Sequence, residues 1–198
     1  MPGSPSGLPI LEIAASVGAA LRSAGAHYFL GGSVASSFHG EFRATNDLDL
    51  VTDLRADRVL PFVAALGPDF DVDEFALTEA IRAQSSWNIF FVPVMLKIDL
   101  FALGSSEFDR SEFARRSTVR IGPIELEIKS PEDTILRKLL WFQGGGGVSD
   151  QQWRDVLGVL RVNTRRLDQA YLDSWAGRLG VAELLLQARM QSTPASGA

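Results

Sequence analysis

The chain has 198 residues, of which 46% are hydrophobic, and a formal net charge of −5. This composition excludes a disordered chain, and it excludes a protein that coats nucleic acid without specificity, because such binding needs an excess of Lys and Arg. The absence of cysteine excludes disulfides and thiolate metal sites, and with two histidines the carboxylates become the main candidate metal ligands. The N-terminal residues show no signal-peptide pattern, and no apolar stretch is as long as a membrane span, which needs about 20 residues. We therefore expect a cytoplasmic protein without membrane contact.

The first third of the chain shows alternating helix and strand patterns. Apolar residues recur at helical spacing, or alternate as they do in a half-buried strand. The expected elements are a helix over residues 10–24, a strand over 28–30, a helix over 34–39, a strand over 47–51 and a helix over 55–66. Gly31 and Gly32 end the first strand, and Ser33 is placed to cap the helix that follows.

The middle of the chain contains two predicted hairpins and then becomes helical. The hairpin strands are expected over residues 87–92 and 95–101, and over 118–121 and 125–128. Ser130, Pro131 and Asp133 supply a cap, a proline at the first helical position and an acid at the third, which predicts a helix start. The run Gly144–Gly147 ends that helix, Ser149 begins the next, and two more are expected over about 167–178 and 181–189.

These patterns predict an α/β (α+β) protein with a short mixed sheet followed by a small helical domain. We expect a first domain over residues 1–129, a helical domain over 130–191 and a disordered tail over 192–198.

Asp47 and Asp49 stand two residues apart in a predicted strand. Their side chains therefore project from the same face of that strand, beside a loop. Two carboxylates that point together repel unless a cation neutralises them, and hard oxygen ligands suit Mg²⁺, which takes further ligands from substrate phosphates. An Asp-x-Asp pattern also arises often by chance, so this pair alone does not define a metal site.

Two further features bear on the same site. Gly31-Gly32-Ser33 follows a strand and opens a helix, where backbone N–H groups favour phosphate, although an ordinary tight turn has the same pattern. Asp99 interrupts an apolar strand pattern between Ile98 and Leu100. A third metal ligand explains this acid, and so does an ion pair with a nearby Lys or Arg.

Taken together, these motifs resemble the signature of polymerase-β-like nucleotidyltransferases, and most of all the AbiEii-type toxin nucleotidyltransferases and their small bacterial relatives. The likeness spans about residues 8–190. It implies the nucleotidyltransferase fold, with the glycine–serine turn (Gly31, Gly32, Ser33) holding the nucleoside triphosphate. By the same resemblance Asp47 and Asp49 bind two Mg²⁺ ions, and Asp99 binds one of them and helps to activate the acceptor.

The resemblance extends to the helical half. Lys138 matches a position that contacts the triphosphate, and Asp155, in the pair Arg154-Asp155, matches an acid near the acceptor that is a candidate base. Salt bridges that tie the two halves together are the alternative for both. Arg43 is a candidate phosphate contact, with an ion pair to Glu41 as its alternative. The neutral run Gly144–Gly147 departs from the basic connector of the toxin group.

The expected reaction is transfer of a nucleoside monophosphate from an NTP to a hydroxyl, with release of pyrophosphate. The acceptor stays open among a tRNA 3′ end, a small molecule such as an aminoglycoside and a protein side chain, and a toxin would have an antitoxin protein as partner. Two alternatives remain. One is a non-catalytic nucleotide-binding regulatory protein with the same fold, and the other is a structural domain whose three acids are scattered in surface ion pairs.

Overall fold

The structure, a computed structural model, describes residues 9–42, 45 and 47–192. The chain divides into two compact units. The first unit holds residues 9–31, 45 and 47–128, and the second holds residues 32–42 and 129–192. Residues 32–42, which the sequence pattern places in the first domain, therefore belong with the C-terminal helices. Within the described ranges, no helix is long and apolar enough to cross a membrane.

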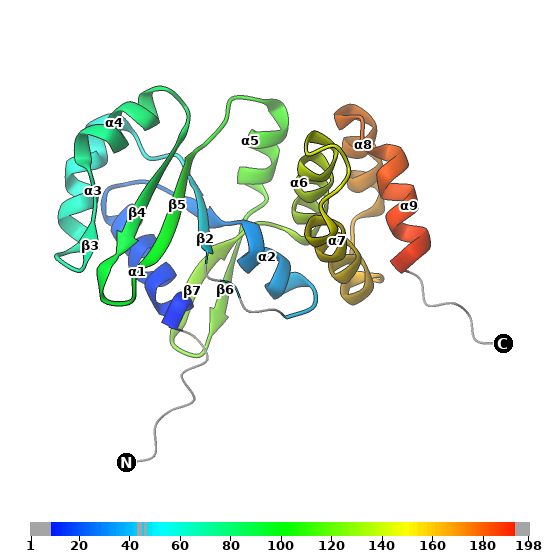
Figure 1. Cartoon of the computed structure of the whole chain (residues 1–198), viewed down its shortest axis with the longest axis horizontal. Helices are drawn as coiled ribbons and strands as arrows, with labels where there is room; N and C mark the ends of the chain where they lie inside the picture. The colour runs from blue at the N-terminus through cyan, green and yellow to red at the C-terminus, as the bar shows by residue number, and fades with distance from the viewer. Residues whose placement is uncertain (1–8, 43–44, 46, 193–198) are drawn as a thin grey trace, which may run out of the picture. The chain divides into compact units, whose positions relative to one another are not determined.

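The first unit is built on a mixed sheet, in agreement with the expected fold class (Figure 1). Its seven described strands lie in the order β3-β4-β5-β2-β1-β7-β6. The pairs β2–β5 and β1–β7 are parallel and the other neighbours are antiparallel. The strands are β1 (Tyr28–Leu30), β2 (Asp47–Thr52), β3 (Phe70–Asp71), β4 (Ser86–Phe91), β5 (Leu96–Ala102), β6 (Ser117–Ile121) and β7 (Ile124–Ile128).

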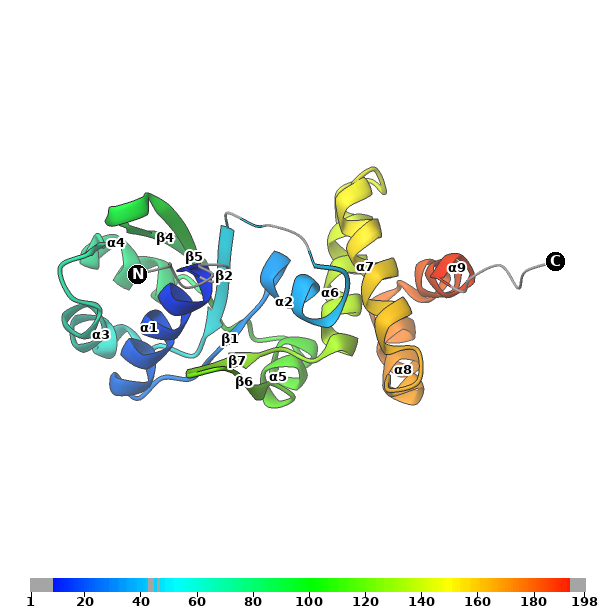
Figure 2. The ribbon, with the colours of Figure 1, turned by 90° about the horizontal axis from the view of Figure 1, so that it is seen from below.

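Helices of the first unit lie on both faces of its sheet (Figures 1 and 2). The helical elements are α1 (Pro9–Ser23), η1 (Ala56–Arg58), α3 (Val59–Leu66), α4 (Glu74–Arg82), η2 (Val92–Val94) and α5 (Glu107–Ala114). Tyr28 meets α1, where a Cβ on Gly18 would lie 2.2 Å from the Tyr28 hydroxyl oxygen. Phe29, one residue on, packs against Phe113 of α5, with ring centroids 5.9 Å apart. Because successive strand residues point to opposite faces, α1 and α5 lie on opposite faces of the sheet.

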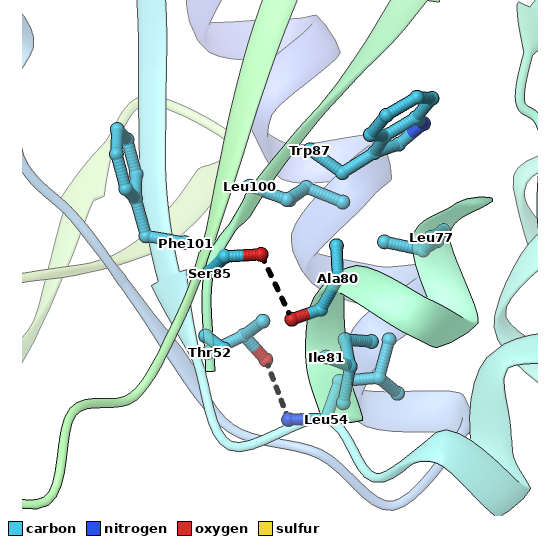
Figure 3. A pocket seen from close by; sticks show the side chains of 10 residues that line it. Thr52, Leu54, Leu77, Ala80, Ile81, Ser85, Trp87, Leu100 and Phe101 are labelled. Carbon is cyan, nitrogen blue, oxygen red and sulfur yellow. Dashed lines mark hydrogen bonds between the residues drawn. The ribbon is translucent and has the colours of Figure 1, made fainter. Parts of the chain in front are cut away.

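Alternation along β2 and β5 makes one face of the sheet apolar. Leu48, Leu50 and Ile98 are fully buried, and Leu100 is nearly so. Burial of each such side chain stabilises the fold by about 1.5–3 kcal/mol. Figure 3 shows where α4 joins this face, in a cavity with no space for a water molecule. The lining residues Leu54, Leu77 and Leu100 are buried and belong to the core. The opposite face of β2 and β5 carries Asp47, Asp49, Lys97 and Asp99.

The second unit is helical. Its elements are α2 (Gly32–His39), α6 (Pro131–Gly144), α7 (Asp150–Asn163), α8 (Gln169–Leu179) and α9 (Ala182–Ser192). The predicted caps at Ser130 and Ser149 are confirmed, since their side chains accept from the backbone N–H groups of Asp133 and Gln152. The cap predicted at Ser33 is wrong, because α2 begins at Gly32 and Ser33 lies within the helix. Helix α9 extends to Ser192, and the rest of the expected tail, residues 193–198, lies outside the described residues.

The end of α2 packs closely on α7. A Cβ on Gly40 would lie 2.9 Å from the backbone nitrogen of Val159, so only glycine fits there without a shift. His39 Nε2 lies 2.7 Å from the Lys129 carbonyl oxygen, just before α6. The side-chain amide of Asn163 donates to the His39 carbonyl oxygen. These contacts explain why residues 32–42 belong to the helical unit.

Candidate functional site

Three carboxylates lie on the polar face of the sheet in the first unit. Asp47 and Asp49 share one face of β2 because they are two residues apart. Strand β5 runs parallel to β2, with Asp99 directly opposite Asp49. Neighbouring strands are about 4.8 Å apart, so the parallel register brings the Asp49 and Asp99 side chains next to each other on one face.

Lys97 joins this group from the same face of β5. Its Cα partner across the strands is Asp47, and its Nζ lies 2.9 Å from Asp99 Oδ2. The Lys97 side chain is 42% exposed and that of Asp99 is 16% exposed. The pKa of Lys97 is raised above its usual value, first by the hydrogen bond to Asp99 and further by the charges of Asp99, Asp47 and Asp49. We call these four residues the carboxylate–lysine cluster.

The chemistry of the cluster fits a magnesium ion. Its donors are hard carboxylate oxygens, the ligand type that Mg²⁺ prefers. The Lys97 ammonium lies at Asp99 and places a positive charge beside the carboxylates. Among the residues that the structure describes, no group of three or more His, Asp or Glu side chains is placed to hold a metal ion, so Asp47, Asp49 and Asp99 supply the ligand chemistry but not a formed three-carboxylate site.

Asn88 is a neighbour of the cluster that the sequence analysis missed. It lies on β4 opposite Asp99, and its side chain is exposed. Its amide is a polar group beside the carboxylates, with capacity both to donate and to accept hydrogen bonds. The signal was present in the sequence, because alternation with Trp87 and the buried Ile89 assigns Asn88 to the polar face of the strand.

The glycine–serine turn begins in the first unit and continues in the second. Gly31 donates its backbone N–H to the Asp49 carbonyl oxygen at 2.9 Å, which fixes the end of β1 to the strand that carries Asp49. Gly32 has a φ of +49°, a value that favours glycine, and it begins α2 with Ser33. Arg43 lies outside the described residues. Its alternative partner, Glu41, pairs with Arg161 at 3.2 Å.

Lys138 and Asp155 contact each other inside the second unit. Lys138 Nζ on α6 lies 2.7 Å from Asp155 Oδ2 on α7, and the two side chains are 4% and 6% exposed. Gln151 donates to the other carboxylate oxygen of Asp155 at 3.0 Å, and the Lys138 ammonium lies 5.8 Å from the ring centroid of Trp141. This mutual pair differs from the separate roles or separate ion pairs that the sequence predicts for Lys138 and Asp155.

Comparison with solved structures identifies the fold. An antigenic nucleotidyltransferase-like protein from Paracoccidioides brasiliensis is similar with a TM-score of 0.56 and 18% identity, over 91% of this chain and 93% of that one. The antibiotic-resistance factor ANT(2'')-Ia is similar with a TM-score of 0.51 and 9% identity, over 90% of this chain and 97% of that one. No protein-family profile matches the chain, and no curated protein matches it by sequence. The chain therefore has an α/β nucleotidyltransferase-like fold followed by C-terminal helices.

Proposed function

We propose that this chain is a magnesium-dependent nucleotidyltransferase that transfers a nucleoside monophosphate from an NTP to a hydroxyl acceptor. The observation that carries the proposal is the register of β2 and β5, which sets Asp49 beside Asp99 on the face that also bears Asp47. On a nucleotidyltransferase-like fold, carboxylates in this arrangement are the expected ligands of the catalytic metal, and the proposal assigns them two Mg²⁺ ions.

The residues have distinct roles in this proposal. When bound, magnesium would lower the pKa of the attacking hydroxyl and neutralise charge on the phosphates. Asp47 and Asp49 would hold the metal, and Asp99 would also face the acceptor hydroxyl. Backbone N–H groups at Gly31, Gly32 and Ser33 bind the triphosphate. The acceptor oxygen forms a bond to the α-phosphorus, the bond from that phosphorus to the bridging oxygen breaks, and pyrophosphate leaves while the hydroxyl proton passes to a carboxylate or to solvent.

Lys138 and Asp155 have a lesser place in the proposal. A contact from Lys138 to the triphosphate, or a role of Asp155 as base, requires their ion pair to open, because both side chains are almost completely buried. Opening a buried pair leaves two charges without their partner and is costly. The geometry therefore supports a structural role for the pair within the helical unit more directly than a chemical one.

The acceptor class is the open part of the proposal. The sequence resemblance to AbiEii-type toxins favours the 3′ end of a tRNA, and it adds an antitoxin protein as a partner of a toxin in the cytoplasm. The similarity of fold to an antibiotic-resistance factor favours a small molecule instead. A protein hydroxyl is the third class. A test of function must therefore offer all three acceptors.

The test is incubation with each α-³²P-labelled NTP and Mg²⁺, together with total tRNA, an aminoglycoside panel or total protein. Wild type is compared with Asp47→Ala/Asp49→Ala and with a matched double variant, Asp57→Ala/Asp69→Ala, which removes two exposed acids elsewhere in the first unit. We expect wild type and the matched control to transfer label. The Asp47/Asp49 variant should lose about a thousandfold or more of the rate, since the metal contributes several kcal/mol to stabilisation of the transition state.

Other outcomes separate the alternatives. Metal-dependent NTP binding in calorimetry without transfer of label would favour the non-catalytic regulatory protein. Absence of both binding and transfer would show that the site assignment is wrong.

A further inference from the structure

The position of Lys97 distinguishes it from the other exposed basic residues of the first unit. Arg82 pairs with Glu79 on the same helix, and Arg120 pairs with Glu125 on the neighbouring strand. Lys97 instead contacts Asp99 and shares its face of the sheet with two more carboxylates, Asp47 and Asp49, on the neighbouring strand. The Lys97 ammonium therefore lies on the same face of the sheet as three negatively charged side chains.

An ordinary structural ion pair does not explain this arrangement well. Exposed Lys–Asp pairs contribute only about 0–1 kcal/mol to stability, and the Lys97 side chain is 42% exposed. The three carboxylates repel one another when no cation is near them, because they share one face of two adjacent strands. A tethered ammonium at Asp99 offsets part of that repulsion.

The same position makes the ammonium a competitor for any divalent cation that binds Asp99. Lysine carries a compact charge on a flexible four-carbon stem, so it can leave the carboxylate without a change in the backbone. Two cations at one carboxylate repel each other, so occupancy by Lys97 and by a metal ion oppose each other.

We propose that Lys97 is a resident cation of the carboxylate–lysine cluster, which stabilises the metal-free chain and weakens binding of divalent metal when no nucleotide is bound. This inference rests on the proposed function, because it takes Asp47, Asp49 and Asp99 as the metal ligands. Lys97 is a positioning residue here, since it acts on the metal through the carboxylates. The cluster therefore binds divalent metal less tightly than the three carboxylates would without Lys97.

The test measures Mn²⁺ binding to the nucleotide-free protein at low salt, from the electron paramagnetic resonance signal of free Mn²⁺. Lys97→Gln removes the charge, and Lys97→Met is a second neutral variant in case the first folds poorly. Lys97→Arg keeps the charge. Arg120→Gln is the matched control, because it removes one charge from an exposed pair of the same 2.9 Å length on β6.

We expect the neutral Lys97 variants to bind Mn²⁺ about threefold to tenfold more tightly than wild type. Lys97→Arg and Arg120→Gln should stay within about twofold of wild type, because the charge is kept in one and is distant in the other. In EDTA, the neutral variants should melt about 1–3 °C lower than wild type, since the carboxylates lose their counter-charge.

Asp47→Ala/Asp49→Ala separates the two ways in which the inference can fail. Equal Mn²⁺ affinity in wild type and both neutral Lys97 variants, with binding lost in the Asp47/Asp49 variant, would overturn the role of Lys97 and leave the metal site intact. Binding that is absent from wild type, or unchanged in the Asp47/Asp49 variant, would overturn both the metal site and the role of Lys97.

Discussion

Two lysine–aspartate pairs of this chain have similar lengths and opposite settings. The Lys97–Asp99 pair, at 2.9 Å, lies on a sheet face that is partly exposed and carries two further acids. The Lys138–Asp155 pair, at 2.7 Å, is buried between α6 and α7. In a buried pair, replacing either charged partner by water costs much free energy, whereas in an exposed pair it costs little. The comparison teaches that two pairs of similar length can differ in burial and in the number of neighbouring charges, and that these two properties set the free-energy cost of breaking each pair.

The largest expected effect on stability comes from breaking the buried pair. Asp155→Asn should lower the free energy of unfolding by about 3–5 kcal/mol, because the Lys138 ammonium is left buried without its charged partner. Urea denaturation measures this change. The double variant Lys138→Met/Asp155→Leu should recover most of the loss, since it removes both charges together. A double variant as unstable as Asp155→Asn would show that the charges are not the reason.

The next largest effect on stability is expected where the end of α2 packs closely on α7, the helix that carries Asp155. Gly40→Ala should cost about 1–3 kcal/mol, because its Cβ would meet backbone atoms of α7 at 2.9 Å. Gly177→Ala on α8 is the matched control, with no atom within 4 Å of the added Cβ. It should stabilise the protein by about 0.5–1 kcal/mol through helix propensity. Thermal unfolding of both variants measures these changes in stability. Equal effects of the two substitutions would contradict the packing argument.

A third effect in the helical unit depends on pH. Burial lowers the pKa of His39, so the unfolded chain binds a proton more readily than the folded chain at mildly acidic pH. Stability should therefore be complete above about pH 6.5 and fall as the pH decreases below it. His39→Gln keeps a donor for the Lys129 carbonyl oxygen and removes the titration. Urea unfolding between pH 7.5 and 5.5 should show a shallower decrease for His39→Gln, and an unchanged decrease would exclude His39 as its source.

The smallest effect is expected at the exposed cluster. Asp47→Asn should change the free energy of unfolding by no more than about 0.5–1 kcal/mol, in the stabilising direction, because it removes one of three like charges. The change should shrink in 1 M NaCl, whereas the loss caused by Asp155→Asn should persist, because salt screens exposed charges more than buried ones. Thermal melts at low and high salt measure both. Destabilisation by Asp47→Asn as large as that by Asp155→Asn would remove the contrast between the two sites.

Much of the local structure was predictable, because its signals lie within a few residues. The cap at Ser130 and the alternation in β2 are examples. Helix α5 was missed although Ser106 and Asp109 form a capping box at its start, because its apolar residues are few. The helix expected from residue 55 begins as a separate turn, η1, and α3 starts only at Val59.

The arrangement of the site was less predictable. Asp47 and Asp49 share a face by alternation alone, but no local pattern sets Asp99 opposite Asp49, because that register depends on the pairing of distant strands. The same holds for Lys138 and Asp155. Helical spacing gives each residue a face on its own helix, and it does not determine which side chain of another helix will meet that face.

The parallel pairing of β2 with β5 also has a consequence for folding kinetics. Asp49 meets a residue fifty positions later in the chain, so a long loop must close before the two carboxylates are adjacent. Contacts of such high sequence separation slow folding. A cation that binds the assembled carboxylates finds no such site in the unfolded chain. It should therefore lengthen the lifetime of the folded state, through a slower unfolding rate, more than it accelerates refolding.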